Sequence, residues 1–312
     1  MIRTALKSVD TFLFPARSTA WIGWLRIGLG VAISVYSISL WSDWSYLFAS
    51  GSDSLVSREL SEDVLSLDSS LLPRLGWFVA LGAKVGLGEA TSLRAVLGLL
   101  LASGILLIGG LFSRPAAIAA WLIHLAARGS GAFTSYGVDH FLTTGLFYLM
   151  LCPMPDCHSL DARLFRSNGP NPHRVGFHQR LLQLHLCLIY FFAGLAKALG
   201  PGWWNGNSIW RALTRAPFDV VSPDFLVRWS LFFPVVGLAI WLLELGYPLF
   251  MWPRRTRALG LIAITAMHAG IGVTMGLYLF ALVLIVLNLA AFAPELLVRR
   301  SPSHSGPHLS RR

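Results

Sequence analysis

The sequence contains a series of long apolar runs, and these runs limit the chain to one class of fold. A helix needs about 20 mostly apolar residues to cross a bilayer, and eight segments are predicted to do so. They are Trp21–Trp41, Leu93–Phe112, Ala116–Phe133, Phe141–Cys152 with its flanks, Leu181–Leu199, Trp229–Trp252, Ala258–Met275 and Gly276–Phe292. The sequence therefore predicts an all-α polytopic integral membrane protein with about eight transmembrane helices.

The composition agrees with a chain embedded in lipid. Charged residues make up 13% of the chain, whereas soluble domains carry roughly 25%. The formal net charge is +10, but the basic residues stand in short clusters between the apolar runs, as in the loops of membrane proteins. This pattern argues against an aqueous globular enzyme and against a nucleic-acid-binding surface.

Two details refine the number of spans. The run Leu75–Leu87 has 13 residues, a length typical of interfacial or re-entrant segments, so we do not count it as a span. The last two spans have no polar linker between them. They are predicted to form a tight hairpin at Gly276.

The distribution of basic residues predicts the orientation, because Lys and Arg collect on the cytoplasmic side. Fifteen Lys and Arg residues fall on the side that holds both termini and seven on the other side, so both termini are predicted to be cytoplasmic. The predicted organisation is a cytoplasmic or interfacial N-terminus over residues 1–19, a helix bundle over 20–294 with an external loop at 42–90, and a polar, disordered tail over 295–312.

Ionisable residues inside the membrane are candidates for function, because charge at that depth is costly. The candidates are Arg26, His124, Asp139, His140, His185, Lys197, Glu244 and His268. Counting along the spans places Arg26 and Glu244 in the inner part of the membrane, where we expect a structural ion pair. The others, apart from His185, are placed at mid-depth or in the outer half, where a histidine is more often a packing residue than a catalyst.

Lys197 carries the most specific chemical hypothesis. Burial disfavours the ammonium form of a lysine, and a neutral amine is a general base. Asp139 nearby would oppose this by favouring the charged form, while His140 and His268 could donate hydrogen bonds to a developing oxyanion. This set suggests proton abstraction from a weakly acidic hydroxyl such as a phenol or hydroquinone. The alternative is a lysine that extends to the outer interface.

The segment after Lys197 has two interpretations. Gly and Pro end the helix there, and Trp residues suit the membrane–water interface. Trp203 and Gly206 belong either to an interfacial anchor or to a turn that holds the lysine. The three cysteines are Cys152, Cys157 and Cys187. Their spacing does not match a haem-attachment motif, and no metal site is predicted.

These motifs together resemble the HTTM family, the horizontally transferred transmembrane domain proteins, which include the vitamin K-dependent gamma-glutamyl carboxylases. The stretch Tyr190-Phe-Phe-Ala-Gly-Leu-Ala-Lys197, followed by Trp203 and Gly206, resembles the family signature. The other matching motifs, in order, are Arg26 with Gly28 and Gly30, Tyr136-Gly-Val-Asp-His140, Ser159-Leu-Asp161, Glu244, and Met267-His268. The resemblance covers roughly residues 15–294.

The resemblance implies roles for several residues. Lys197 would deprotonate a reduced quinone, a menaquinone or vitamin K-like cofactor, and His140 and His268 would assist. Asp139, His124, Trp203 and Gly206 would support the pocket. The large lumenal domain of the carboxylases has no counterpart in 312 residues, so carboxylation of a protein is not expected.

The sequence therefore predicts a bacterial inner-membrane HTTM protein, an enzyme acting on a quinol or a similar lipophilic hydroxyl. Its activity would be coupled to modification or maturation of an exported partner. Two alternatives stay open. One is a non-catalytic membrane subunit that binds a partner protein, and the other is a small-molecule transporter, which the lack of an evident repeat disfavours.

Overall fold

The structure, a computed structural model, describes residues 2–51, 54–68, 71–131, 135–165 and 169–297. Within these ranges the chain is helical and contains no strand. Eight longer helices correspond to the eight apolar runs. They are α2 (Ala20–Ser39), α6 (Glu89–Gly109), α7 (Ser113–Ser130), α8 (Gly137–Leu151), α10 (Pro172–Ala198), α14 (Phe233–Leu245), α16 (Arg254–Met275) and α17 (Tyr278–Phe292).

Six helical segments of the described chain are long and apolar enough to cross a membrane. They are α2, α6, α10, the run Pro223–Leu245 that ends with α14, α16, and the run Tyr278–Leu296 that begins with α17. A polytopic membrane protein is thus confirmed, with six such helices where about eight were predicted. The helices α7 and α8 are outside this set. At 1.5 Å per residue, α8 is only ~22 Å long, short of the ~30 Å hydrocarbon core.

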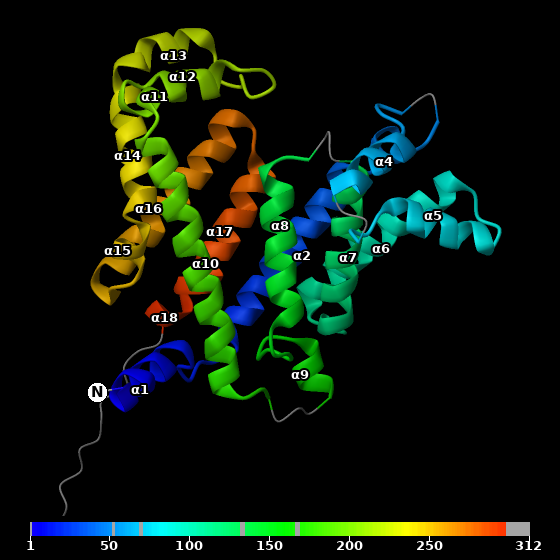
Figure 1. Ribbon diagram of the computed structural model, residues 1–312, viewed down its shortest axis with the longest axis horizontal. Coiled ribbons are helices and arrows are strands. Elements are labelled where there is room, and N and C mark those ends of the chain that lie inside the picture. The colour runs from blue at the N-terminus through cyan, green and yellow to red at the C-terminus, as the bar shows by residue number, and fades with distance from the viewer. Residues whose placement is uncertain (1, 52–53, 69–70, 132–134, 166–168, 298–312) are drawn as a thin grey trace, which may run out of the picture.

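The last long helix, α17, lies at the centre of the bundle (Figure 1). It packs against α2, α8, α10 and α16. The turn between α16 and α17 is tight, because Gly276 has a φ of 70°, a conformation that glycine adopts without steric cost. The hairpin predicted at this glycine is confirmed.

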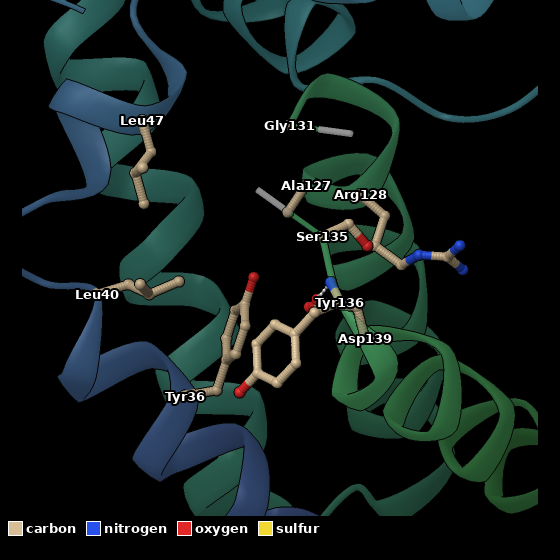
Figure 2. Close-up of a pocket in the computed structure, with 9 residues that line it drawn as sticks. All are labelled: Tyr36, Leu40, Leu47, Ala127, Arg128, Gly131, Ser135, Tyr136 and Asp139. Carbon is tan, nitrogen blue, oxygen red and sulfur yellow. Dashed lines mark hydrogen bonds between the residues drawn. The ribbon is translucent and has the colours of Figure 1, made fainter. Parts of the chain in front are cut away.

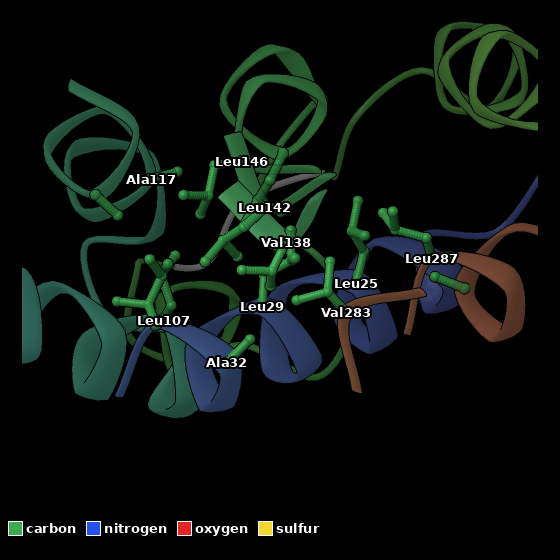
Figure 3. Packing of buried hydrophobic residues seen from close by; sticks show 14 of the residues in the cluster. Leu25, Leu29, Ala32, Leu107, Ala117, Val138, Leu142, Leu146, Val283 and Leu287 are labelled. Carbon is green, nitrogen blue, oxygen red and sulfur yellow. The ribbon is translucent and has the colours of Figure 1, made fainter. Parts of the chain in front are cut away.

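The hydrophobic core lies where α2, α8 and α17 meet (Figure 3). Fully buried leucines and valines from the three helices interdigitate there, among them Leu29, Leu142 and Val283. A close crossing joins α2 to α6, since a Cβ on Gly30 would lie 2.9 Å from the carbonyl oxygen of Gly104. Small residues at such crossings let helix backbones approach within a membrane.

The short helices gather at the two ends of the bundle (Figure 1). One end, which we call the α1 end, holds α1 (Ile2–Leu13), α9 (Leu160–Leu164), α15 (Tyr247–Met251) and α18 (Pro294–Leu297). The opposite end, the α12 end, holds α4 (Arg58–Asp68), α5 (Leu75–Lys84), α11 (Pro201–Trp204), α12 (Asn207–Thr214) and α13 (Pro223–Trp229). The first and last described helices therefore lie at the same end. Residues 298–312 of the predicted polar tail lie outside the described residues.

The segment predicted as an external loop at 42–90 is folded in its described part. It forms α3 (Trp44–Phe48), α4 and α5. Glu62 links α4 to α5 and to the bundle helix α7. One of its carboxylate oxygens accepts hydrogen bonds from the Gly76 amide of α5 at 2.9 Å and from the Ser130 hydroxyl of α7 at 2.5 Å. Arg58 bridges Glu62 and Glu89. With 10 residues, α5 is too short to span a bilayer, in agreement with its exclusion from the spans.

Candidate functional site

A lysine and a glutamate form an ion pair between α10 and α14. Lys197 Nζ lies 2.6 Å from Glu244 Oε2, with side-chain exposures of 22% and 8%. The Lys197 ammonium also lies 5.2 Å from the centre of the Trp203 ring, within range of a cation–π interaction. The two helices approach closely at Gly194, where a Cβ would collide with the backbone of Leu245. That close approach brings the two side chains within reach.

The short helices α11 and α12 pack against α14 at the α12 end, and α11 also contacts α10 (Figure 1). Their path depends on Gly206, which has a φ of 82°. A Cβ there would lie 2.7 Å from the backbone nitrogen of Pro234. The structure thus gives Trp203 a direct contact with the lysine, and it gives Gly206 a backbone role in the turn.

A chain of four buried polar side chains runs beside the ion pair. The Tyr247 hydroxyl lies 2.6 Å from Asn288 Oδ1, and Asn288 Nδ2 lies 2.7 Å from the Tyr190 hydroxyl. The Tyr190 hydroxyl lies 2.6 Å from His268 Nε2. Tyr190 and Lys197 are seven residues apart on α10, so they share one helix face. The polar chain and the ion pair therefore belong to one region between α10, α14, α16 and α17.

The direction of this hydrogen-bond chain is determined by a backbone carbonyl. Asn288 Nδ2 also lies 2.8 Å from the Leu284 carbonyl oxygen, which can only accept, so the amide nitrogen must face it. It follows that Tyr247 donates to Asn288 and that Asn288 donates to Tyr190. Among the described residues, His268 Nε2 is then the recorded acceptor for the Tyr190 hydroxyl proton. The ring proton of a neutral His268 then lies on Nδ1, which is buried without a partner among the described residues.

A second polar group lies between α7 and α8. His124 Nε2 lies 3.5 Å from Asp139 Oδ1, and His124 Nδ1 lies 3.0 Å from the Thr143 hydroxyl. The Asp139 carboxylate also accepts a hydrogen bond from the Tyr136 amide at 2.9 Å. His140 points elsewhere, since its Nδ1 accepts a hydrogen bond from the Arg128 guanidinium at 3.1 Å.

A small cavity of about 100 Å³ opens beside this second group (Figure 2). Tyr36 and Tyr136 face each other across it, and Asp139 lies at its wall. Burial raises the pKa of the Tyr136 hydroxyl above its ordinary value, and the Asp139 charge adds to this effect. The cavity is therefore lined by Tyr136 as a neutral phenol.

Comparison with protein families settles which family this chain belongs to. A family model described as the HTTM domain matches residues 90–295, more than half of the chain. The chain belongs to the HTTM family. Searches of curated proteins and of solved structures returned no match. The matched HTTM region contains both polar groups described above, whereas Arg26 on α2 precedes it.

The HTTM fold separates residues that the sequence analysis placed together. Lys197 pairs with Glu244 and contacts Trp203, and His268 joins the neighbouring hydrogen-bond chain. His140, Asp139 and His124 lie in the second group. No recorded contact among the described residues links His140 to Lys197, so the expected cooperation of these two side chains has no direct geometric basis.

The predicted ion pair between Arg26 and Glu244 is wrong. Arg26 Nε lies 2.7 Å from Asp156 Oδ2, and both side chains are fully buried. The physical reason is the packing of α10 against α14. The two helices approach closely at Gly194, which places Lys197 beside Glu244, and Glu244 pairs with this lysine instead of Arg26.

Several functional-site residues were missed by the sequence analysis. Asn288 and Tyr247 form the hydrogen-bond chain with Tyr190 and His268, but neither of the two was a candidate, and Tyr190 was named only as part of the family signature. Asn288 stands alone as a polar residue in the apolar helix α17. An isolated amide in a spanning helix is a signal that it needs an internal partner, and that signal was available in the sequence.

Proposed function

We propose that this HTTM-family protein is a bacterial inner-membrane enzyme with cytoplasmic termini. Lys197 accepts a proton from the hydroxyl group of a lipophilic substrate. The substrate class is a quinol of the menaquinone or vitamin K type. The observation that carries the proposal is the part-buried Lys197–Glu244 pair, which lies beside His268 and its unpaired ring nitrogen.

The geometry supports separate roles for the Lys197–Glu244 pair, which accepts the proton, and for His268, which stabilises the oxyanion. The short contact between Lys197 and Glu244 allows the ammonium proton to pass to the carboxylate, which leaves a neutral amine beside a neutral acid. The amine then accepts the proton of the substrate hydroxyl, and a Nδ1–H donor on His268 would stabilise the oxyanion that forms.

Mass spectrometry of co-purified lipids tests this proposal. We expect a quinone to be enriched in the purified wild-type protein relative to the bulk membrane extract, and its amount or oxidation state to change in Lys197→Ala and Lys197→Arg. Lys84→Ala removes an exposed lysine from α5 and is the matched control. Equal quinone content in all four proteins, with equal thermal stability, would refute the proposal.

A second candidate function, a subunit that binds an exported partner protein, is favoured by the surface of α4 and α5. Leu67, Leu81 and Val85 are exposed there by 86%, 62% and 73%. A photo-crosslinking residue at position 67 or 85 should capture such a partner from intact cells. The same residue at Leu259 on α16, 70% exposed, is the control, and equal capture at all positions contradicts this candidate.

A further inference from the structure

A larger cavity lies on the opposite side of Arg128 from the cavity shown in Figure 2. Its volume is about 360 Å³, within the range of small-molecule sites. Its lining residues come from α4, α7, α8 and the segments beside them, and they are Leu65, Leu72, Leu125, Arg128, Gly129, Ser135 and His140. None of these residues takes part in the Lys197–Glu244 pair.

Arg128 lies between the two cavities and turns its charge toward the larger one. Figure 2 shows its guanidinium directed away from Tyr36 and Tyr136. One guanidinium nitrogen bonds to His140, while its Nε is buried and has no hydrogen-bond partner among the described residues. A buried donor left without an acceptor is costly, so this group favours a ligand that accepts hydrogen bonds.

Two further donors accompany Arg128. A guanidinium only donates, so His140 Nδ1 must be the acceptor and His140 carries a proton on Nε2. The Ser135 hydroxyl is buried and unpartnered in the described part of the chain. Arginine, serine and histidine thus line one cavity that has no acidic residue in its lining.

The neighbouring acid decides where an anion can bind. Asp139 lines the smaller cavity, and its carboxylate repels a negative group there. The larger cavity instead combines the three donors with an apolar wall of Leu65, Leu72 and Leu125. We propose that this cavity binds an anionic oxygen group, a carboxylate or a phosphate, that is carried by an apolar chain. This site stands independently of the reaction proposed at Lys197.

Calorimetric titration of the full-length protein in a neutral detergent tests the site, with dodecanoate as the probe. Wild type should bind dodecanoate, and Arg128→Gln should bind it at least tenfold more weakly. Dodecanol, which has the same chain without the charge, should bind the wild type at least tenfold more weakly than dodecanoate. Arg94→Gln removes an exposed arginine of α6 that lines neither cavity, and it should bind like the wild type.

Competition identifies the source of the anion. If phosphatidylglycerol displaces dodecanoate, the natural ligand is a membrane lipid. If inorganic phosphate alone displaces it, the ligand is a soluble anion, and the assignment of an apolar chain is overturned.

Two results overturn the whole proposal. One is dodecanoate affinity in Arg128→Gln within twofold of wild type, and the other is equal affinity of the wild type for dodecanoate and dodecanol. If Arg128→Gln does not fold, Ser135→Ala and Arg128→Lys are titrated in its place. We expect dodecanoate to bind several-fold more weakly to Ser135→Ala and with near wild-type affinity to Arg128→Lys.

Discussion

Replacing Asp156 by asparagine tests the buried ion pair that Arg26 makes in place of the pair expected from the sequence. The substitution keeps the shape of the side chain and removes its charge, which leaves the fully buried Arg26 without a counter-ion. Breaking one partner of a buried pair costs about 3–5 kcal/mol. Arg26 keeps hydrogen bonds to the carbonyl groups of Leu107 and Ile108, so we expect the lower value, about 3 kcal/mol.

The assay is reversible unfolding of the purified protein in mixed micelles, titrated with sodium dodecyl sulfate and followed by circular dichroism. A double-mutant cycle with Arg26→Gln and Asp156→Asn measures the free energy of coupling between the two side chains. We expect about 2 kcal/mol, within the range for residues in direct contact. The same cycle with Arg26→Gln and Glu244→Gln is the control and should give less than about 0.5 kcal/mol.

The reasoning is refuted by the reverse pattern. A loss below about 1 kcal/mol in Asp156→Asn would mean that Arg26 is not held as a buried ion pair. Coupling between Arg26 and Glu244 that exceeds the coupling between Arg26 and Asp156 would restore the partner expected from the sequence and contradict the position of α14.

Three further predictions follow from close contacts in the same bundle. Gly194→Ala forces α10 away from Leu245 and should lower the melting temperature, with a loss of about 1–3 kcal/mol in the free energy of unfolding. Gly98→Ala, where a Cβ meets nothing, is the control and should leave the melting temperature unchanged. Gly206→Ala strains a backbone at positive φ and should cost about 1–2 kcal/mol, measured by the same unfolding titration; an unchanged midpoint would contradict that conformation. Asn288→Leu leaves the Tyr190 hydroxyl without its donor, so we expect the free energy of unfolding to fall by about 1–3 kcal/mol and quinol turnover to become slower. A wild-type turnover rate would show that the hydrogen-bond chain takes no part in the reaction.

The long helices could be predicted because a lipid-embedded helix must be apolar over a known length. Each of the eight apolar runs corresponds to a helix, and Gly276 ends α16 as expected. The count of spans was harder, since α7 carries charged residues at both ends and α8 is short. The 15 residues of α8 are too few for a span, whereas α7 has 18 residues but is less apolar than a spanning helix.

The partners of the polar residues could not be predicted from the sequence. Asp156 lies in a connection that is polar in composition, and only the folded chain shows that this connection returns beneath α2 to meet Arg26. Counting from the ends of the apolar runs placed Lys197 in the outer half and Glu244 in the inner part, whereas the packing of α10 against α14 brings their side chains within 2.6 Å. Motif order indicated the family, whereas side-chain pairing depended on tertiary geometry.

The central position of α17 has a consequence for biosynthesis. The ribosome makes this helix after every other long helix, so the earlier helices enter the membrane before their common packing surface exists. The polar chain shares the delay, because Tyr190 has no Asn288 to bond with until the last hairpin inserts. The central helix therefore joins the bundle after the other long helices, and a nascent chain arrested before Tyr278 should be a substrate for membrane quality control.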